Sequence, residues 1–189
     1  MTILTISGTP GSGKSTIAKI LQSELQAERI YVGGIRRELA RSKGMTLEEL
    51  NEYAQTHPET DVDVDKAATK VARESQNKFV LVEGRVMFHF LPESLKIYIK
   101  VSDEEGAKRI WKDLQNKETQ QERNEGNIQS FEEMKTRLKE RTQNDAKRYE
   151  KYYQLNPYDE SHYDFILDTT TITAQQGADR ILEYIKKNL

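Results

Sequence analysis

The chain has 189 residues, of which 35% are hydrophobic and 32% are charged, and its formal net charge is −2. This length predicts a single domain over residues 1–189, and the low apolar content predicts a small core under a large solvated surface. The near-neutral charge argues against a general attraction to nucleic acid or to an anionic membrane. The chain contains no cysteine, which excludes disulfides, thiolate metal sites and cysteine nucleophiles.

No run of apolar residues approaches the length that spans a bilayer. The chain begins directly with an expected strand rather than with a signal peptide. We therefore expect a cytoplasmic enzyme that acts as a monomer, without nucleic acid or membrane partners.

The most specific motif lies near the N-terminus, where residues 8–16 are Gly-Thr-Pro-Gly-Ser-Gly-Lys-Ser-Thr. An apolar run at 3–6 predicts a strand before it, and apolar spacing predicts a helix over 16–27 after it. A phosphate-binding P-loop requires this strand–loop–helix setting, which disfavours the alternative of a chance glycine-rich turn. The motif predicts binding of a nucleoside triphosphate together with Mg2+.

Each part of this loop has an expected role in holding ATP. Its glycines let consecutive N–H groups point at phosphate oxygens, and the helix that follows adds the positive end of its dipole. Lys14 is expected near the β and γ phosphates, and the Ser15 hydroxyl is the expected Mg2+ ligand. The predicted ATP-binding residues are Gly8, Thr9, Pro10, Gly11, Ser12, Gly13, Lys14, Ser15 and Thr16.

Beyond the P-loop, short apolar runs alternate with helical patterns. Strands are predicted at 29–32, 79–82, 95–101 and 165–167, and helices at 35–42, 46–56, 59–76, 103–114, 130–153 and from 173 onward. Capping boxes at Thr46 and Ser130 open two of these helices, Asp103 is expected to cap a third, and Thr173 with Gln176 the last. The alternation predicts an α/β P-loop fold in three layers, a central parallel sheet of about five strands with helices on both faces.

Residues 115–129 contain almost no apolar side chain that could anchor them to a core. One interpretation is a solvated loop. The other is a mobile lid, because the segment lies between two predicted helices and carries Lys117 and Arg123. Lids that close on phosphates need few core contacts and some cationic side chains. Position alone does not decide between the two.

Glu83, Gly84 and Arg85 directly follow the predicted strand 79–82. In open α/β sheets, ligands bind at the carboxyl ends of the strands, so Glu83 is placed to reach Mg2+ or its waters. Gly84 permits a ligand to approach the backbone closely, and Arg85 can neutralise a phosphate. The alternative is a surface ion pair between Glu83 and Arg85.

Two further groups of charged residues follow the second predicted strand. Arg36, Arg37 and Arg41 lie in a helix whose first turn disfavours cations, so an anion partner for Arg36 or Arg37 is expected, and the alternative is a solvated basic face. Asp61 and Asp65 are one helical turn apart. They are either solvated acids or part of a base or ribose pocket.

Arg141, Asp145 and Arg148 are spaced four and three residues apart, so they share one face of the predicted helix 130–153. Such spacing commonly produces a salt-bridge ladder within a helix, and this interpretation is favoured without further context. The alternative is that the arginines contact phosphates opposite the P-loop.

Taken together, these residues resemble the nucleoside monophosphate kinases, and within them the archaeal-type cytidylate kinases, over nearly the whole chain. The P-loop, the stretch 33–40 with Arg37, the stretch 44–61, the Glu83-Gly84-Arg85 motif and the Arg141/Asp145/Arg148 element carry the resemblance. It implies an acceptor-binding helical region at 34–76 and a lid at about 112–130, called the lid segment below.

The resemblance also implies roles for individual residues. The implied catalytic residues are Lys14, Arg85, Arg109 and Arg123, and Ser15 with Glu83 would hold Mg2+, Glu83 directly or through water. The implied acceptor-binding residues are Arg37, Asp61, Asp65, Gly84, Arg85, Arg141, Asp145 and Arg148.

The chain departs from the family pattern at a few positions. Arg36 stands where an aromatic residue is usual, and Tyr31 where a serine is common. Lys112 and Asp113 occupy the region in which the family has a further arginine after Arg109. Arg123 is therefore expected to replace that lid arginine, with Arg109 beside it.

The expected activity is ATP-dependent phosphorylation of a pyrimidine nucleoside monophosphate, CMP or dCMP. One alternative is a kinase of another nucleotide or of a shikimate-like or sugar acceptor, which would not need so many arginines. Another is a non-catalytic nucleotide-binding module. A nucleic-acid-binding role is disfavoured because no basic stripe with interleaved aromatic residues is present.

Overall fold

The computed structural model describes residues 1–188, which fold around a five-stranded sheet with the strand order β2-β3-β1-β4-β5. All neighbouring strands are parallel. The strands are β1 (Thr2–Gly8), β2 (Glu28–Tyr31), β3 (Phe79–Glu83), β4 (Leu95–Lys100) and β5 (Phe165–Asp168). The predicted parallel sheet of about five strands is therefore confirmed.

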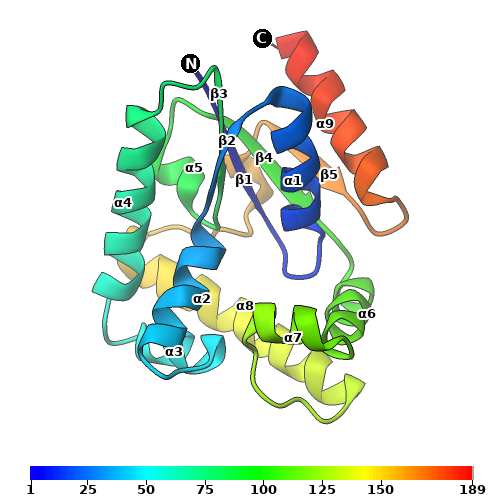
Figure 1. Cartoon of the computed structure of the whole chain (residues 1–189). Helices are drawn as coiled ribbons and strands as arrows, with labels where there is room; N and C mark the ends of the chain where they lie inside the picture. Colours follow the sequence, from blue (N-terminus) through cyan, green and yellow to red (C-terminus); the bar gives the residue numbers. More distant parts are fainter. Residues whose placement is uncertain (189) are drawn as a thin grey trace.

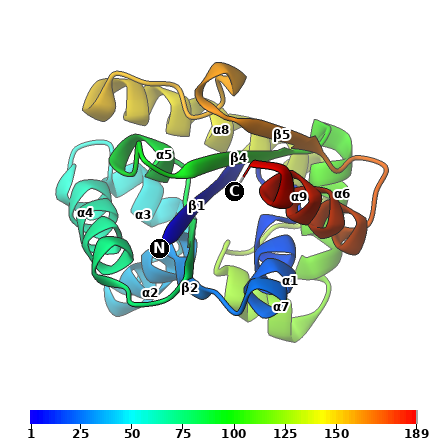
Figure 2. The ribbon, with the colours of Figure 1, turned by 90° about the horizontal axis from the view of Figure 1, so that it is seen from above.

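Helices cover both faces of the sheet, which makes the three predicted layers (Figure 2). On one face, α1 (Lys14–Leu25) and α9 (Ala174–Asn188) pack on Leu4 and Ile6 of β1. On the other, α4 (Glu59–Glu74) and α5 (Met87–Phe90) pack on Ile3 of the same strand. Successive strand residues point to opposite faces, and a parallel strand buried on both sides is apolar throughout.

The carboxyl ends of the strands all point toward the bottom of Figure 1, where a second group of helices lies. These helices are α2 (Val32–Ser42), α3 (Leu47–Tyr53), α6 (Asp103–Leu114), α7 (Lys117–Arg123) and α8 (Phe131–Tyr153). The P-loop ends β1 at the same edge. The fold thus brings the P-loop, the region predicted to bind the acceptor and the lid segment to one end of the sheet.

Most of the predicted caps are present. Thr46 and Glu49 form the reciprocal capping box of α3, and Thr173 and Gln176 exchange hydrogen bonds before α9. The expected cap at Asp103 is wrong, because α6 is capped by the Ser102 side chain, which accepts from Glu105 N at 3.4 Å. Asp103 instead occupies the first helical turn, where a carboxylate complements the helix dipole.

Two α-helices of the described residues were not predicted, and both are short. The four-residue α5 follows the Glu83-Gly84-Arg85 motif without a side-chain cap, so neither periodicity nor a capping signal revealed it. The lid segment contains α7, which buries no residue and is capped by Asn116, whose side chain accepts from Glu118 N at 2.9 Å. A helix without a buried face has no apolar periodicity to detect.

None of the helices within residues 1–188 is both long and apolar enough to cross a bilayer.

Candidate functional site

The P-loop backbone has the conformation that phosphate binding requires. Gly11 has a φ of +75°, and a Cβ built there would lie 2.4 Å from the backbone oxygen of Gly106. No larger residue fits this position without displacing α6. Gly13 is the N-cap of α1 and supplies no side-chain cap, so the first N–H groups of the helix remain available to a phosphate.

Lys14 holds the loop together from inside. Its Nζ donates to the backbone oxygens of Gly8 at 3.0 Å and Thr9 at 2.7 Å. Burial, followed by the nearby cations Arg85, Arg141 and Arg37, lowers the pKa of Lys14 to about 7, although Glu83 acts in the opposite direction. Burial and neighbouring cations therefore both disfavour the charged form of Lys14 in the free protein.

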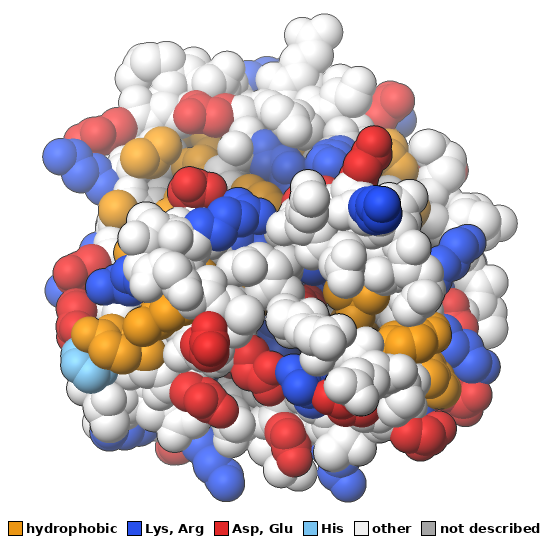
Figure 3. All heavy atoms as spheres, turned by 60° about the horizontal axis from the view of Figure 1, so that its bottom comes forward, with side chains coloured by type: hydrophobic (Ala, Val, Ile, Leu, Met, Phe, Trp, Pro, Cys, Tyr) orange, Lys and Arg blue, Asp and Glu red, His pale blue; other side chains and the backbone are white. Residues whose placement is uncertain are grey.

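A cavity of about 490 Å3 extends from the P-loop between α2, α6, α7 and α8. In Figure 3, which brings this face forward, Lys and Arg side chains lie in its recesses. Of the predicted ATP-binding residues, 10–16 line the cavity, whereas Gly8 and Thr9 lie behind it and carry the carbonyls that Lys14 contacts.

The residues predicted to hold Mg2+ contact each other. The Ser15 hydroxyl donates to Glu83 Oε1 at 2.6 Å, and Glu83 is only 3% exposed. A hydroxyl and a carboxylate are the hard oxygen ligands that Mg2+ prefers, so this pair fits the ion. Residues 1–188 contain no group of three or more His, Cys, Asp or Glu side chains that could hold a metal, so ATP oxygens and water would complete its coordination.

The alternative of a Glu83–Arg85 surface ion pair is wrong. Glu83 Oε2 pairs with Arg29 Nη2 at 2.5 Å, while Arg85 Nε lies 2.8 Å from Asp145 Oδ2. Arg29 was missed by the sequence reasoning. Its signal is weak, since it shows only once β2 is known to lie beside β3.

On the acceptor side, Arg37, Asp65, Gly84, Arg85 and Arg141 line the cavity. Neither Nη of Arg85 has a hydrogen-bond partner within residues 1–188, because the side chain is held only through Nε. Arg141 donates from Nη1 to Glu125 at 3.2 Å, and its buried Nε has no partner in the described chain. Burial lowers the pKa of Arg141. Two guanidinium groups thus have donors to offer an anion.

Behind the cavity, buried charges alternate in a chain from α2 to the end of β3. Arg36 pairs with Asp61, Asp61 lies 2.8 Å from Arg148 Nε, and Arg148 Nη2 lies 2.7 Å from Asp145 Oδ1. Asp145 in turn pairs with Arg85. Burial acts to raise the pKa of Asp145, but the Arg85, Arg148 and Arg141 guanidinium groups lower it to about 2.

This buried chain decides several alternatives left open by the sequence. The anion partner of Arg36 is Asp61 within the protein, and Asp61 and Asp65 are not solvated, since they are 1% and 5% exposed. Of the possible ladder along α8, only the Asp145–Arg148 pair forms, because Arg141 turns to Glu125. Asp61 and Arg148 do not line the large cavity. They lie behind it and position the residues that do.

The lid segment is docked on the acceptor-binding region. Arg37 Nε donates to the backbone oxygen of Arg123 at 3.0 Å, and Arg41 Nη2 donates to that of Gln121 at 3.1 Å. Both contacts fall on the C-terminal turn of α7, where unpaired carbonyls favour cations. Lys117 is exposed and does not line the cavity.

Arg109, before the lid segment, and Arg123, within it, are the two candidate catalytic arginines at this side of the cavity, and different partners hold them. Arg109 lines the cavity but is directed to Glu105, at 2.8 Å, and to the backbone oxygen of Thr169, at 2.7 Å. Arg123 lines the same cavity and pairs with Asp113 at 2.5 Å and Glu125 at 3.3 Å. Glu125 is 8% exposed and was not predicted, because nothing in its polar surroundings marks it as buried.

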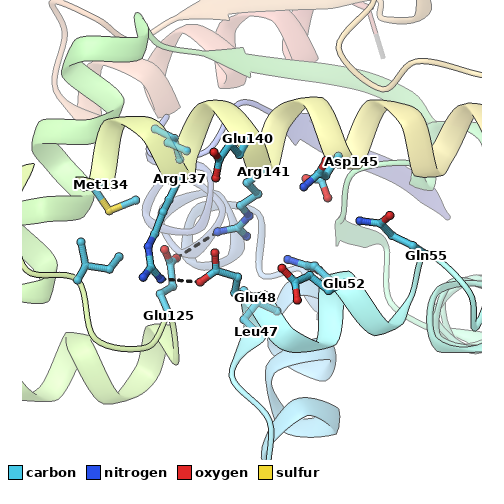
Figure 4. Close-up of a pocket in the computed structure, with 14 residues that line it drawn as sticks. Leu47, Glu48, Glu52, Gln55, Glu125, Met134, Arg137, Glu140, Arg141 and Asp145 are labelled. Atoms are coloured by element: carbon cyan, nitrogen blue, oxygen red, sulfur yellow. Dashed lines mark hydrogen bonds and ion pairs between the residues drawn. The ribbon is translucent and has the colours of Figure 1, made fainter. Parts of the chain in front are cut away.

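A second, smaller cavity of about 80 Å3 adjoins the first between α3 and α8. Figure 4 shows Glu125 and Arg141 pointing toward each other at its wall, with Asp145 farther along α8. Glu125 and Arg141 line both cavities, as do Leu47 and Asn51, so the ion pair forms part of the boundary between the two spaces.

Comparisons with known proteins identify relatives that are named as kinases. A protein family described as "AAA domain" matches residues 4–130. The curated cytidylate kinase of Archaeoglobus fulgidus is 33% identical over 184 residues, which cover 97% of this chain and 94% of that one. The cytidylate kinase of Methanothrix thermoacetophila is 36% identical over 88% of each chain.

One relative is a longer protein. The S-adenosylmethionine-dependent nucleotide dehydratase of Lacinutrix mariniflava is 31% identical over 99% of this chain. The chain spans only 36% of its length. This similarity therefore concerns one part of that protein.

Solved structures share the fold at low sequence identity. A shikimate kinase from Acinetobacter baumannii, solved with shikimate, has a TM-score of 0.59 and 20% identity over 100% of this chain and 94% of that one. A putative kinase from Chloroflexus aurantiacus has a TM-score of 0.64 and 12% identity over 100% and 98%. At these identities, the likeness shows the P-loop kinase fold alone.

Proposed function

The chain belongs to the cytidylate kinase family, and from this premise we propose that it transfers the γ-phosphoryl group of ATP to CMP or dCMP. The observation that carries the proposal is the composition of the large cavity. The P-loop forms one wall, and Arg37, Arg85 and Arg141 face it from the other elements. A site built this way suits two phosphate-bearing molecules placed end to end.

The transfer itself needs little covalent help from the protein. The bond between the γ phosphorus and the β–γ bridging oxygen breaks, and its electron pair stays on ADP. A phosphate oxygen of the acceptor forms the new bond. No general base is required, because the acceptor phosphate is already a charged nucleophile.

The protein contributes placement and charge. The P-loop amides and Lys14 would hold the triphosphate, and Arg85 and Arg141 would bring the acceptor phosphate in line with it. Ser15 and Glu83 would hold the Mg2+ that accompanies ATP, which would neutralise further phosphate charge. Docking of the lid segment on α2 would exclude water from the reaction.

The density of arginine supports a charged acceptor over a neutral one. A neutral sugar-like hydroxyl acceptor offers no anionic group to the donors of Arg85 and Arg141 that Asp145 and Glu125 leave free, and these buried donors would then remain without a partner. The curated relatives point the same way, because both groups of names, cytidylate kinase and nucleotide dehydratase, refer to nucleotides.

The test is release of ADP from Mg-ATP by the purified protein with CMP, dCMP, UMP, AMP, GMP or shikimate, against a blank without acceptor. The proposal expects the highest kcat/KM with CMP or dCMP. Preference for AMP or UMP would keep the arginine roles and overturn the base assignment. Turnover of shikimate, or of no acceptor at all, would overturn the proposal.

A further inference from the structure

The lid segment carries a charge arrangement that the family pattern does not predict. In place of a further arginine after Arg109, the chain has Asp113, and this carboxylate reaches across to Arg123 at the far end of α7. Arg123 Nε donates to Asp113 Oδ2 at 3.0 Å, and Nη2 donates to the same oxygen at 2.5 Å. The Arg123 guanidinium group therefore lies beside the region of α6 in which the family has a further arginine.

A second carboxylate fixes the other side of Arg123. Its Nη1 donates to Glu125 Oε1 at 3.3 Å, and the same oxygen accepts from Arg141 Nη1 at 3.2 Å. Burial acts to raise the pKa of Glu125, but Arg141, Arg123 and Arg37 hold it below its usual range, so the group remains a carboxylate. Glu125 thus joins the lid cation to the acceptor-side cation.

We infer that Asp113 and Glu125 are positioning residues that present Arg123 to the transferring phosphoryl group, as one unit with Arg141. This inference rests on the proposed function. An arginine has five N–H donors in a rigid fork, and the two carboxylates use three of them. Two donors remain, and Arg123 lines the cavity that holds the P-loop.

The two carboxylates also fix the position of the Arg123 guanidinium group before substrate binds. An unrestrained arginine on α7, a helix without buried residues, would lose rotamer freedom each time it met the phosphoryl group. Because carboxylates on both sides restrict the Arg123 side chain, this rotamer entropy is already lost when the protein folds. Preorganised cations stabilise the charge that develops in a transition state. The backbone contact from Arg37 to Arg123 links the same unit to the acceptor-binding helix.

The inference is tested by a double-mutant cycle on Asp113→Asn and Arg123→Ala with CMP as acceptor. We expect Arg123→Ala to lower kcat about a hundredfold, in the range of a lost electrostatic donor. Asp113→Asn and Glu125→Gln should each lower kcat about tenfold while both KM values change less than twofold. In the Arg123→Ala background, Asp113→Asn should lower kcat less than twofold further.

A matched control is Glu104→Gln, which removes an exposed carboxylate on the same helix, paired only with Lys108. It should leave kcat unchanged. If Asp113→Asn lowers kcat equally with and without Arg123, or lowers only the melting temperature, Asp113 is a structural contact and the inference fails. Normal kcat in Arg123→Ala also overturns it, while wild-type turnover of CMP would leave the proposed function standing. Absence of wild-type turnover with every nucleotide overturns the proposed function itself.

Discussion

The two walls of the cavity are built on different physical principles. The proposed ATP wall is the continuous P-loop segment 8–16, in which the glycine conformations direct backbone N–H groups toward the expected phosphate position. The proposed acceptor wall contains Arg37 of α2, Arg85 just after β3 and Arg141 of α8, and buried carboxylates hold Arg85 and Arg141 in place. A local backbone motif therefore tolerates few substitutions. In a wall made of ion pairs from several elements, by contrast, a cation at another position can replace one that is missing.

The largest effect is expected on the ATP wall. Lys14→Ala removes the one ammonium that contacts the loop carbonyls, and we expect kcat to fall on the order of a thousandfold. The variant should remain folded, and its melting temperature should not fall, because burial and neighbouring cations disfavour the charged lysine in the free protein. Steady-state kinetics and thermal melting measure the two effects. Full activity would show that the P-loop is not the ATP site.

On the acceptor wall, Arg85→Ala should act on activity and stability together. Loss of a phosphate contact is expected to lower kcat/KM for CMP about a hundredfold. The change also leaves Asp145 without one of its two cations, and removing one partner of a buried pair costs about 3 kcal/mol. Urea unfolding at 25 °C measures this second loss. If Lys14→Ala destabilises the protein as much as Arg85→Ala, the contrast between the two walls is wrong.

The same contrast explains what could be predicted from sequence. The P-loop, the individual strands and most caps depend on residues that are close in the sequence, so short patterns reveal them. The partners of Arg36, Arg85 and Arg123 come from 25, 60 and 10 residues away, and only folding brings each pair together. Spacing along α8 suggested that Arg141 would pair with Asp145, but a buried carboxylate in a polar loop, Glu125, competes for it.

A smaller effect concerns protons taken up when nucleotide binds. Because the pKa of Lys14 is about 7 in the free protein, part of the population is neutral at pH 7.5. Triphosphate oxygens favour the charged form, so binding of Mg-ATP should take up about half a proton or more at this pH and little at pH 6. Calorimetry in two buffers of different ionisation enthalpy measures the uptake. Equal binding heats in both buffers at pH 7.5 would contradict it.

The smallest effect tests Asp65, a buried cavity carboxylate that forms no ion pair in the described chain. Asp65 accepts from the Tyr153 hydroxyl at 2.9 Å, and burial raises the pKa of Asp65 to about 7. The native state therefore binds this proton more tightly than the unfolded state, whose pKa is about 3.9. Its contribution to stability is fully present below about pH 4 and is lost as the pH rises through 7.

Asp65→Asn keeps a neutral side chain of the same shape and removes this titration. Its free energy of unfolding should match that of the wild type near pH 4 and exceed it at pH 8.5, measured by urea unfolding. Asp145→Asn is the matched contrast, because the pKa of Asp145 is lowered to about 2 by its arginines, and loss of that charge should destabilise the protein at both pH values. If the two variants respond alike to pH, the acceptor wall does not distinguish carboxylates that hold arginines from one that faces the cavity alone. In that case, the overall balance of charges at this wall, rather than its specific ion pairs, would determine its stability.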